Sequence, residues 1–180
     1  SEDVLIPFLA RELRRPVKWI EDRRENLANT RHARDQLHDV EAAYDDDGRI
    51  LALLDRCIVD AGAYNPYAIT VSYNSAAHLR NQFAIDHLRV ECRSVLTNKA
   101  PVTPVRGAGR PEVTFVMDRV IGLVARDLGL DPIEVRRRNL IRPEQMPYDT
   151  HFPQGRGTVV YDGGDYPRLL ETAVKEIGYD

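Results

Sequence analysis

The spacing of apolar residues changes along this 180-residue chain, from every second residue in the first half to helical spacing in the second. Side chains of a strand alternate between two faces, whereas those of a helix return to one face every three to four residues. The pattern therefore predicts a strand-rich part over residues 1–98, a loop over 99–110 and a helical part over 111–180. Strands followed by helices are typical of the α+β class, here a mixed sheet with a hairpin and packed helices.

The first part contains the pattern of a β-hairpin. Apolar residues alternate with charged ones from His38 to Asp45, which predicts a half-buried strand. Asp47-Gly48 is a common hairpin turn, and the apolar run Ile50–Val59 predicts the returning strand. Four further predictions concern this part: a helix over Asp3–Leu13 with Pro7 in its first turn, a short strand over Val17–Ile20, a loop over Asp22–Arg34, and a strand over Leu88–Cys92.

The second part contains three predicted helices. The first runs from Pro111 to Gly129 and carries one apolar stripe: Val113, Val116, Met117, Val120, Val124 and Leu128. Asp131-Pro132 predicts the start of a second helix that ends near Leu140. The stretch 142–164 is rich in proline and glycine, which predicts an excursion outside the core. A last helix opens at Asp165, with five residues expected to face inward: Leu169, Leu170, Ala173, Val174 and Ile177.

The composition excludes several classes of partner. With 43% hydrophobic residues, 29% charged residues and a net charge of -3, the chain offers no basic surface for nucleic acid or an anionic membrane. No apolar run is long enough to span a bilayer. Cys57 and Cys92 lack a metal-binding spacing, so we expect buried, reduced thiols in a cytoplasmic chain in preference to a disulfide.

The loop Val105-Arg106-Gly107-Ala108-Gly109-Arg110-Pro111 is the local segment best suited to bind a ligand. Two glycines let the backbone approach a ligand closely, and the following helix start offers free N–H groups to an anion. Arg106 and Arg110 add positive charge and fork-shaped donors. On these residues alone two interpretations stay open, a site for an oxygen-rich cofactor or a tight capping turn with surface arginines.

The same loop resembles a segment of the molybdenum-cofactor-binding large subunit of xanthine dehydrogenase/aldehyde oxidase-type hydroxylases. In that family an Arg-Gly-x-Gly core precedes a long helix, a short aspartate-capped helix and an Arg-x-x-Asn, here Arg136 to Asn139. Four segments before the loop agree with the family in the same order: Arg15-Pro16-Val17-Lys18-Trp19, Asp22-Arg23-Arg24-Glu25, Thr30-Arg31-His32 and Asp60-Ala61-Gly62-Ala63-Tyr64. The resemblance implies that residues 1–180 form part of a molybdopterin-binding domain.

The resemblance also implies roles for single residues. The cofactor-binding positions are Val105, Arg106, Gly107, Ala108 and Gly109, and the backbone of Arg106 contacts the molybdenum end of the pyranopterin. Gly107 and Ala108 form the wall of the substrate pocket, which Asn74 also lines, and no residue of the chain ligates the metal directly. The implied reaction hydroxylates an electrophilic carbon with water as the oxygen source.

Three positions narrow the substrate within this family. Xanthine oxidases carry an aromatic residue at the position of Ala108 and an arginine at that of Asn74, so a purine substrate is not expected. Carbon monoxide dehydrogenases that bind copper carry a cysteine at the position of Gly107, so a copper site is not expected either. The sequence is most similar to form II, carbon monoxide dehydrogenase-like large subunits, and the small Ala108 favours an aldehyde or an N-heteroaromatic compound.

The family relationship implies further components outside this chain. The cofactor is expected in its cytosine dinucleotide form, and iron–sulfur clusters and FAD are expected on partner subunits of a heterotrimer. The family's glycine-rich segment would precede Ser1 and its catalytic glutamate would follow Asp180, so we expect the 180 residues alone to be inactive. Two alternatives remain: a non-catalytic anion-binding, cofactor-binding or interaction domain, and a structural module whose loop only caps a helix.

Overall fold

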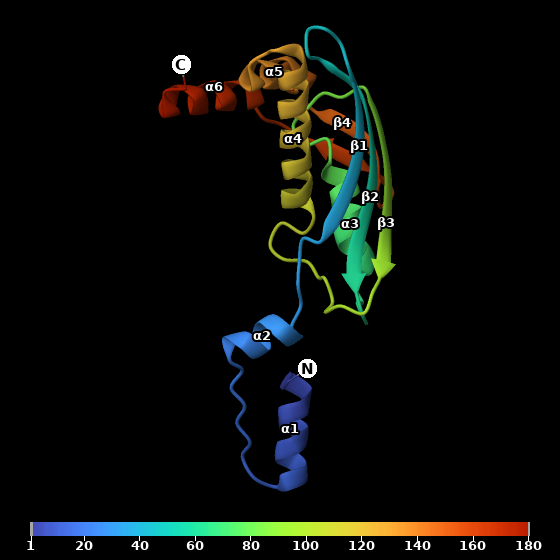
Figure 1. Ribbon diagram of the computed structural model, residues 1–180, viewed down its shortest axis with the longest axis vertical. Coiled ribbons are helices and arrows are strands. Elements are labelled where there is room, and N and C mark those ends of the chain that lie inside the picture. Colours follow the sequence, from blue (N-terminus) through green and yellow to red (C-terminus); the bar gives the residue numbers. More distant parts are fainter. Residues whose placement is uncertain (1, 180) are drawn as a thin grey trace.

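The computed structural model describes residues 2–179 as a three-stranded sheet covered by helices, with a short arm at the N-terminus (Figure 1). Its elements follow in this order: α1 (Glu2–Leu13), α2 (Arg23–Asn29), β1 (Gln36–Tyr44), β2 (Ile50–Gly62), α3 (Ala68–His78), β3 (His87–Leu96), α4 (Arg110–Leu128), α5 (Pro132–Asn139), the 3-10 turn η1 (Pro143–Gln145), β4 (Tyr148–Gln154), β5 (Gly157–Tyr161) and α6 (Tyr166–Ile177).

The main sheet has the order β1-β2-β3 and is mixed. β1 and β2 pair antiparallel through the turn at Asp47-Gly48, whereas β2 and β3 pair parallel, with α3 in the connection between them. The predicted hairpin and the third strand are therefore confirmed, as is the α+β class. In register, His38 lies opposite Cys57, which lies opposite Cys92, so these three side chains form one row across the sheet.

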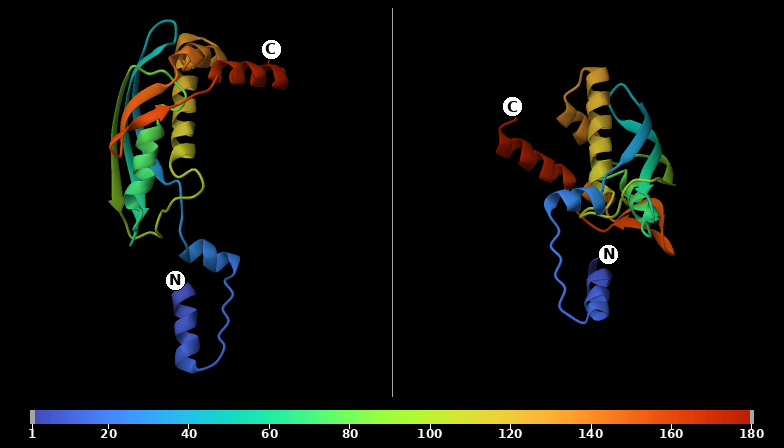
Figure 2. Two further views of the ribbon diagram at one scale, coloured as in Figure 1. Left: turned by 180° about the vertical axis from the view of Figure 1, so that it is seen from behind. Right: turned by 60° about the horizontal axis from the view of Figure 1, so that its bottom comes forward.

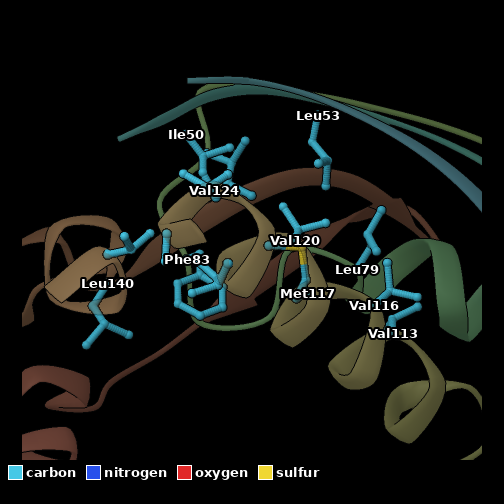
Figure 3. Packing of buried hydrophobic residues seen from close by; sticks show 14 residues of the cluster. Ile50, Leu53, Leu79, Phe83, Val113, Val116, Met117, Val120, Val124 and Leu140 are labelled. Carbon is cyan, nitrogen blue, oxygen red and sulfur yellow. The ribbon is translucent and has the colours of Figure 1, made fainter. Parts of the chain in front are cut away.

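The core lies between the sheet and α4, with α3 beside it (Figures 1 and 3). The apolar stripe of α4 faces this core as predicted: Val113, Val116, Met117, Val120 and Val124 are buried and Leu128 packs at the edge. Ile50 and Leu53 of β2 meet them from the sheet. Burial of one such side chain contributes about 1.5–3 kcal/mol, so this interface fixes α4 and the loop that leads into it.

The N-terminal segment differs from three predictions. Pro7 lies inside α1 beyond its first turn, and residues 17–20 form no strand. The predicted loop over residues 22–34 contains α2, because Asp22 accepts from the Glu25 N–H and Glu25 accepts from the Asp22 N–H. Such a reciprocal capping box stabilises even a short helix. Neither α1 nor α2 buries a described residue, and both stand away from the sheet (Figure 2).

Three further differences concern the rest of the chain. The helix α3, which covers one face of the sheet, was not predicted from the sequence. Residues 142–164 contain the β4–β5 hairpin, and Thr150 and Val159 of this hairpin are buried. In α6 Val174 is buried and Leu170 packs against the core, whereas Leu169 and Ile177 are 68% and 71% exposed and Ala173 is also exposed. The inward face predicted for α6 is therefore confirmed for two of its five residues and wrong for the other three.

The cysteines are free thiols, as expected, although only Cys57 is fully buried and Cys92 is half-buried. A hydrogen bond with Cys92 and burial both raise the pKa of Cys57. Within the described residues no helix is long and apolar enough to cross a membrane.

Candidate cofactor site

The base of the loop is tied to two neighbouring segments by backbone hydrogen bonds. The Val102 N–H donates to the Ala61 carbonyl at the end of β2 at 3.0 Å. His32, which precedes β1, accepts from the Thr103 N–H and donates to the Pro101 carbonyl, both at 2.9 Å. These bonds hold the first half of the loop as an additional extended segment beside the sheet.

Asp60 at the end of β2 braces the same base. Its Oδ1 accepts from the Thr97 hydroxyl at 2.7 Å and from the Gly62 N–H at 2.9 Å, and its Oδ2 lies 2.7 Å from Lys99 Nζ. The Lys99 ammonium, then the Thr97 and Gly62 hydrogen bonds, lower the pKa of Asp60 to about 2. The carboxylate is therefore charged at neutral pH and joins three points of the loop base.

We expect Asp60→Asn to destabilise the chain by about 1 kcal/mol at neutral pH, because Oδ1 keeps its two donors while the ion pair with the mostly exposed Lys99 is lost. The pKa of Asp60 is lower in the folded chain than the ordinary value of 3.8. The stabilisation is therefore fully present above about pH 4 and is lost as the pH falls through about 2. Urea unfolding at several pH values measures this, and a difference between wild type and variant that stays constant down to pH 2 would contradict it.

The tip of the loop is a tight turn of three residues with positive φ. The values are 104° for Gly107, 44° for Ala108 and 95° for Gly109. Two backbone bonds close the turn, from the Ala108 N–H to the Val105 carbonyl at 2.7 Å and from the Arg110 N–H to the Gly107 carbonyl at 3.1 Å. A left-handed conformation costs a non-glycine residue roughly 1–2 kcal/mol, so Ala108 stores strain at the tip.

The turn packs directly on α3. A Cβ atom placed on Gly109 would lie 2.7 Å from the Val71 carbonyl oxygen and 2.8 Å from the Ser75 nitrogen. Asn74, which is half-buried, belongs to that same turn of α3. The structure thus brings the helix turn that carries Asn74 against the loop, although the two predicted pocket segments are far apart in sequence.

Gly107 has a structural reason to be glycine that does not involve a ligand. A Cβ atom on it would lie 2.6 Å from Cγ and 2.7 Å from Cδ of the Pro111 ring. Substitution of Gly107 would therefore distort the start of α4 even in the absence of any bound molecule. For this reason a side-chain change at Arg106 tests ligand binding more cleanly than one at Gly107.

The electrostatics of the tip suit an anionic or oxygen-rich group. Gly109 is the N-cap residue of α4 and offers no side-chain cap, so the positive end of the helix dipole is open. Within residues 2–179 the N–H groups of Arg106 and Gly107 make no hydrogen bond. The exposed guanidinium of Arg106 forms no ion pair among the same residues, and Arg110 is also exposed. Burial, followed by the charge of Arg110, lowers the pKa of His78, which favours a neutral imidazole next to the loop.

Two further residues belong to the site and were not identified from the sequence. Arg34 donates from one guanidinium nitrogen to the Arg106 carbonyl and from another to Glu112 Oε2, both at 3.1 Å. Glu112 directly follows the loop motif in sequence, but Arg34 lies far upstream in a segment predicted to be a loop. No local pattern in the sequence indicates this pairing.

The fold is an α+β domain in which a strained backbone turn leads into the N-terminus of a helix packed on the core, an arrangement suited to an oxygen-rich cofactor. The model of the molybdopterin cofactor-binding domain family matches residues 1–140, which is most of the chain. The chain belongs to this family, which confirms the resemblance found in the sequence.

Comparisons with individual relatives support the same family assignment. The chain is 34% identical over 179 residues to the gamma subunit of the 6-hydroxypseudooxynicotine dehydrogenase complex of Paenarthrobacter nicotinovorans, covering 99% of this chain and 22% of that subunit. It is 36% identical over 171 residues to the carbon monoxide dehydrogenase large chain of Hydrogenophaga pseudoflava, covering 93% and 21% of the two chains. The crystal structure of quinoline 2-oxidoreductase from Pseudomonas putida 86 superposes with a TM-score of 0.88 at 35% identity, over 98% of this chain and 22% of that one. The chain thus spans about a fifth of the length of these relatives.

Proposed function

We propose that this chain forms part of the large subunit of a molybdenum hydroxylase and that residues 105–109 form one wall of its molybdopterin site. The observation that carries this proposal is the tip of the loop, where two N–H groups without a partner within residues 2–179 lie beside the uncapped N-terminus of α4, an arrangement that suits an anionic group. The pyranopterin carries oxygen and phosphate groups that such donors bind, so the residues present fit the cofactor.

Each loop residue has a distinct part in this proposal. The backbone of Val105, Arg106 and Gly107 binds the cofactor near its molybdenum end, and Gly109 fixes the turn against α3. Ala108 and Asn74 line the substrate pocket, where the small side chain of Ala108 leaves room for an aldehyde or an N-heteroaromatic compound. When bound, the cofactor supplies the metal-centred redox chemistry that hydroxylates the substrate with water as oxygen source.

Other parts of the working enzyme lie outside these residues in our proposal. The cofactor would be in the cytosine dinucleotide form, and partner subunits of a cytoplasmic heterotrimer would carry the iron–sulfur clusters and FAD that accept the electrons. Relatives named as one subunit of a dehydrogenase complex or as a large chain support a multisubunit assembly. The catalytic base is supplied by another part of the large subunit, so the 180 residues alone do not turn over substrate.

Arg106→Ala tests the proposal in the full-length large subunit. The change leaves the proposed backbone contacts in place and removes the exposed guanidinium, which in our proposal pairs with an anionic group of the cofactor. We therefore expect roughly a tenfold loss in molybdenum retention or in dye-reduction activity, the equivalent of one charge-assisted hydrogen bond. Molybdenum per subunit is measured by elemental analysis after dialysis, and the activity with an aldehyde and with an N-heteroaromatic substrate.

Arg156→Ala is the matched control, since Arg156 is an exposed arginine in the turn between β4 and β5. It should leave metal content and activity unchanged. Equal values for the Arg106 variant, the Arg156 variant and wild type would favour the alternative in which the loop only caps α4.

A further inference from the structure

Arg34 lies in a segment that contacts the base of the loop, the tip of the loop and the first turn of α4. It sits between α2 and β1 with a positive φ of 70°, two residues after His32. The backbone of His32 is bonded to Pro101 and Thr103 at the base of the loop. The main chain at Arg34 is therefore held close to the loop before its side chain makes any contact.

The side chain of Arg34 joins the loop tip to the first turn of α4. Its two terminal nitrogens reach the Arg106 carbonyl and Glu112 Oε2, at 3.1 Å each. The side chain of Glu112 is 8% exposed and that of Arg34 is 41% exposed. A guanidinium holds its N–H donors in one rigid plane, so the two contacts fix the tip relative to the helix.

Within the described residues two side chains from outside residues 104–109 donate to this tip. Arg34 donates to the Arg106 carbonyl from a segment far away in sequence, and Arg110, the first residue of α4, donates to the Gly107 carbonyl at 3.5 Å. The backbone bonds of the tip lie within the loop or join it to the first turn of α4, and Gly109 also packs against α3. Arg34 therefore supplies the side-chain contact that links the Arg106 carbonyl to a segment far away in sequence.

The bond to the Arg106 carbonyl also sets the direction of the neighbouring donor. The peptide between Arg106 and Gly107 is trans, so the Arg106 carbonyl and the Gly107 N–H lie in one plane and point in opposite directions. Because the Arg106 carbonyl points toward Arg34, the Gly107 N–H, which has no partner within residues 2–179, points away from Arg34. This N–H is one of the two donors assigned above to the cofactor.

We propose that Arg34 is a positioning residue for the cofactor, which acts by fixing the plane of the Arg106–Gly107 peptide and the first turn of α4. The role rests on the proposed function of the loop. Arg34 itself touches neither cofactor nor substrate. Its removal allows the peptide to rotate, so the Gly107 N–H no longer meets the ligand in one orientation.

The test uses the full-length large subunit assembled with its partner subunits. For Arg34→Ala we expect a kcat/KM lower by about tenfold to a hundredfold, the effect of misplacing a bound group by about 1 Å. The electron paramagnetic resonance spectrum of the reduced molybdenum centre should be shifted or broadened. Millimolar guanidinium should restore part of the activity, because the space left by the partly exposed side chain is open to it. Arg119→Ala, an exposed arginine of α4, is the control and should match wild type.

Arg34→Lys keeps the inference testable if Arg34→Ala loses the fold or the metal. An ammonium can pair with Glu112 but cannot hold both acceptors with a planar fork. An altered spectrum, or loss of molybdenum from a folded variant, would support the proposal, whereas a wild-type spectrum and kcat/KM would overturn it. If Arg106→Ala lowers molybdenum while both Arg34 variants match wild type, only the positioning role fails. If all three match wild type, the proposed function fails as well.

Discussion

Gly109→Ala is expected to destabilise the chain by about 3 kcal/mol or more and to disrupt the turn that we propose binds the cofactor. The added Cβ would approach the Val71 carbonyl oxygen and the Ser75 nitrogen to within 2.8 Å, and both are backbone atoms that cannot move aside alone. The φ of 95° adds the strain of a left-handed residue that is not glycine. The loop must therefore lift from α3, or α3 must shift from the sheet.

Gly122→Ala is the matched control for this prediction. Gly122 lies within α4, and a Cβ placed on it meets no atom within 4 Å. Alanine is the better helix former, so this variant should be more stable than wild type by about 0.5–1 kcal/mol. Urea unfolding compares the two variants, and molybdenum content compares them in the full-length subunit. A Gly109 variant as stable as the Gly122 variant would show that the contact with α3 is not tight.

Asn139→Ala is the second substitution for which we expect a large effect, a loss of about 3 kcal/mol. Asn139 is 1% exposed and connects α5 to the turn between β1 and β2. Its Oδ1 accepts from the Ile50 N–H, and its Nδ2 donates to the Gly48 and Val135 carbonyls, all at 2.8 Å. Alanine leaves the Ile50 N–H and the Gly48 carbonyl buried without these partners, and each such group costs about 1–3 kcal/mol.

The exposed Asn26 of α2 provides the comparison, since Asn26→Ala removes one surface hydrogen bond, to Glu21. Its effect should stay within about 0.5 kcal/mol. Thermal unfolding followed by circular dichroism measures both variants. Similar melting temperatures for the two would mean that water enters the Asn139 site and replaces its hydrogen bonds.

The parts of the fold that the sequence predicted are those with a strong apolar period. α4 has a full stripe and glycine at its end, so both its face and its extent are predictable. α3 has no such stripe, because its buried face includes Ser72 and Ser75. Ser72 hides its hydroxyl by donating to the Ile69 carbonyl within the helix, which lets a polar residue occupy a buried position.

Other features depend on partners that a single local pattern does not reveal. Alternation predicts that β3 is a strand, but its parallel direction follows from α3, which was not identified. The apolar residues Leu169 and Ile177 of α6 fit a buried face that this chain does not cover. At the site, Gly107, Ala108 and Gly109 could be predicted from their own conformational demands, whereas Arg34 becomes visible only once the fold brings it to the loop.

The separation between the partners at the loop has a consequence for the order of events during synthesis. Arg34 and Arg106 are 72 residues apart, and Asn139 and Gly48 are 91 apart. Contacts that close such long intervals form late, after the local hairpin and helices. The tip of the loop therefore gains its contacts with Arg34 only after the chain has been synthesised through the first turn of α4. We expect the cofactor to be captured only by a finished domain, as the last step of maturation.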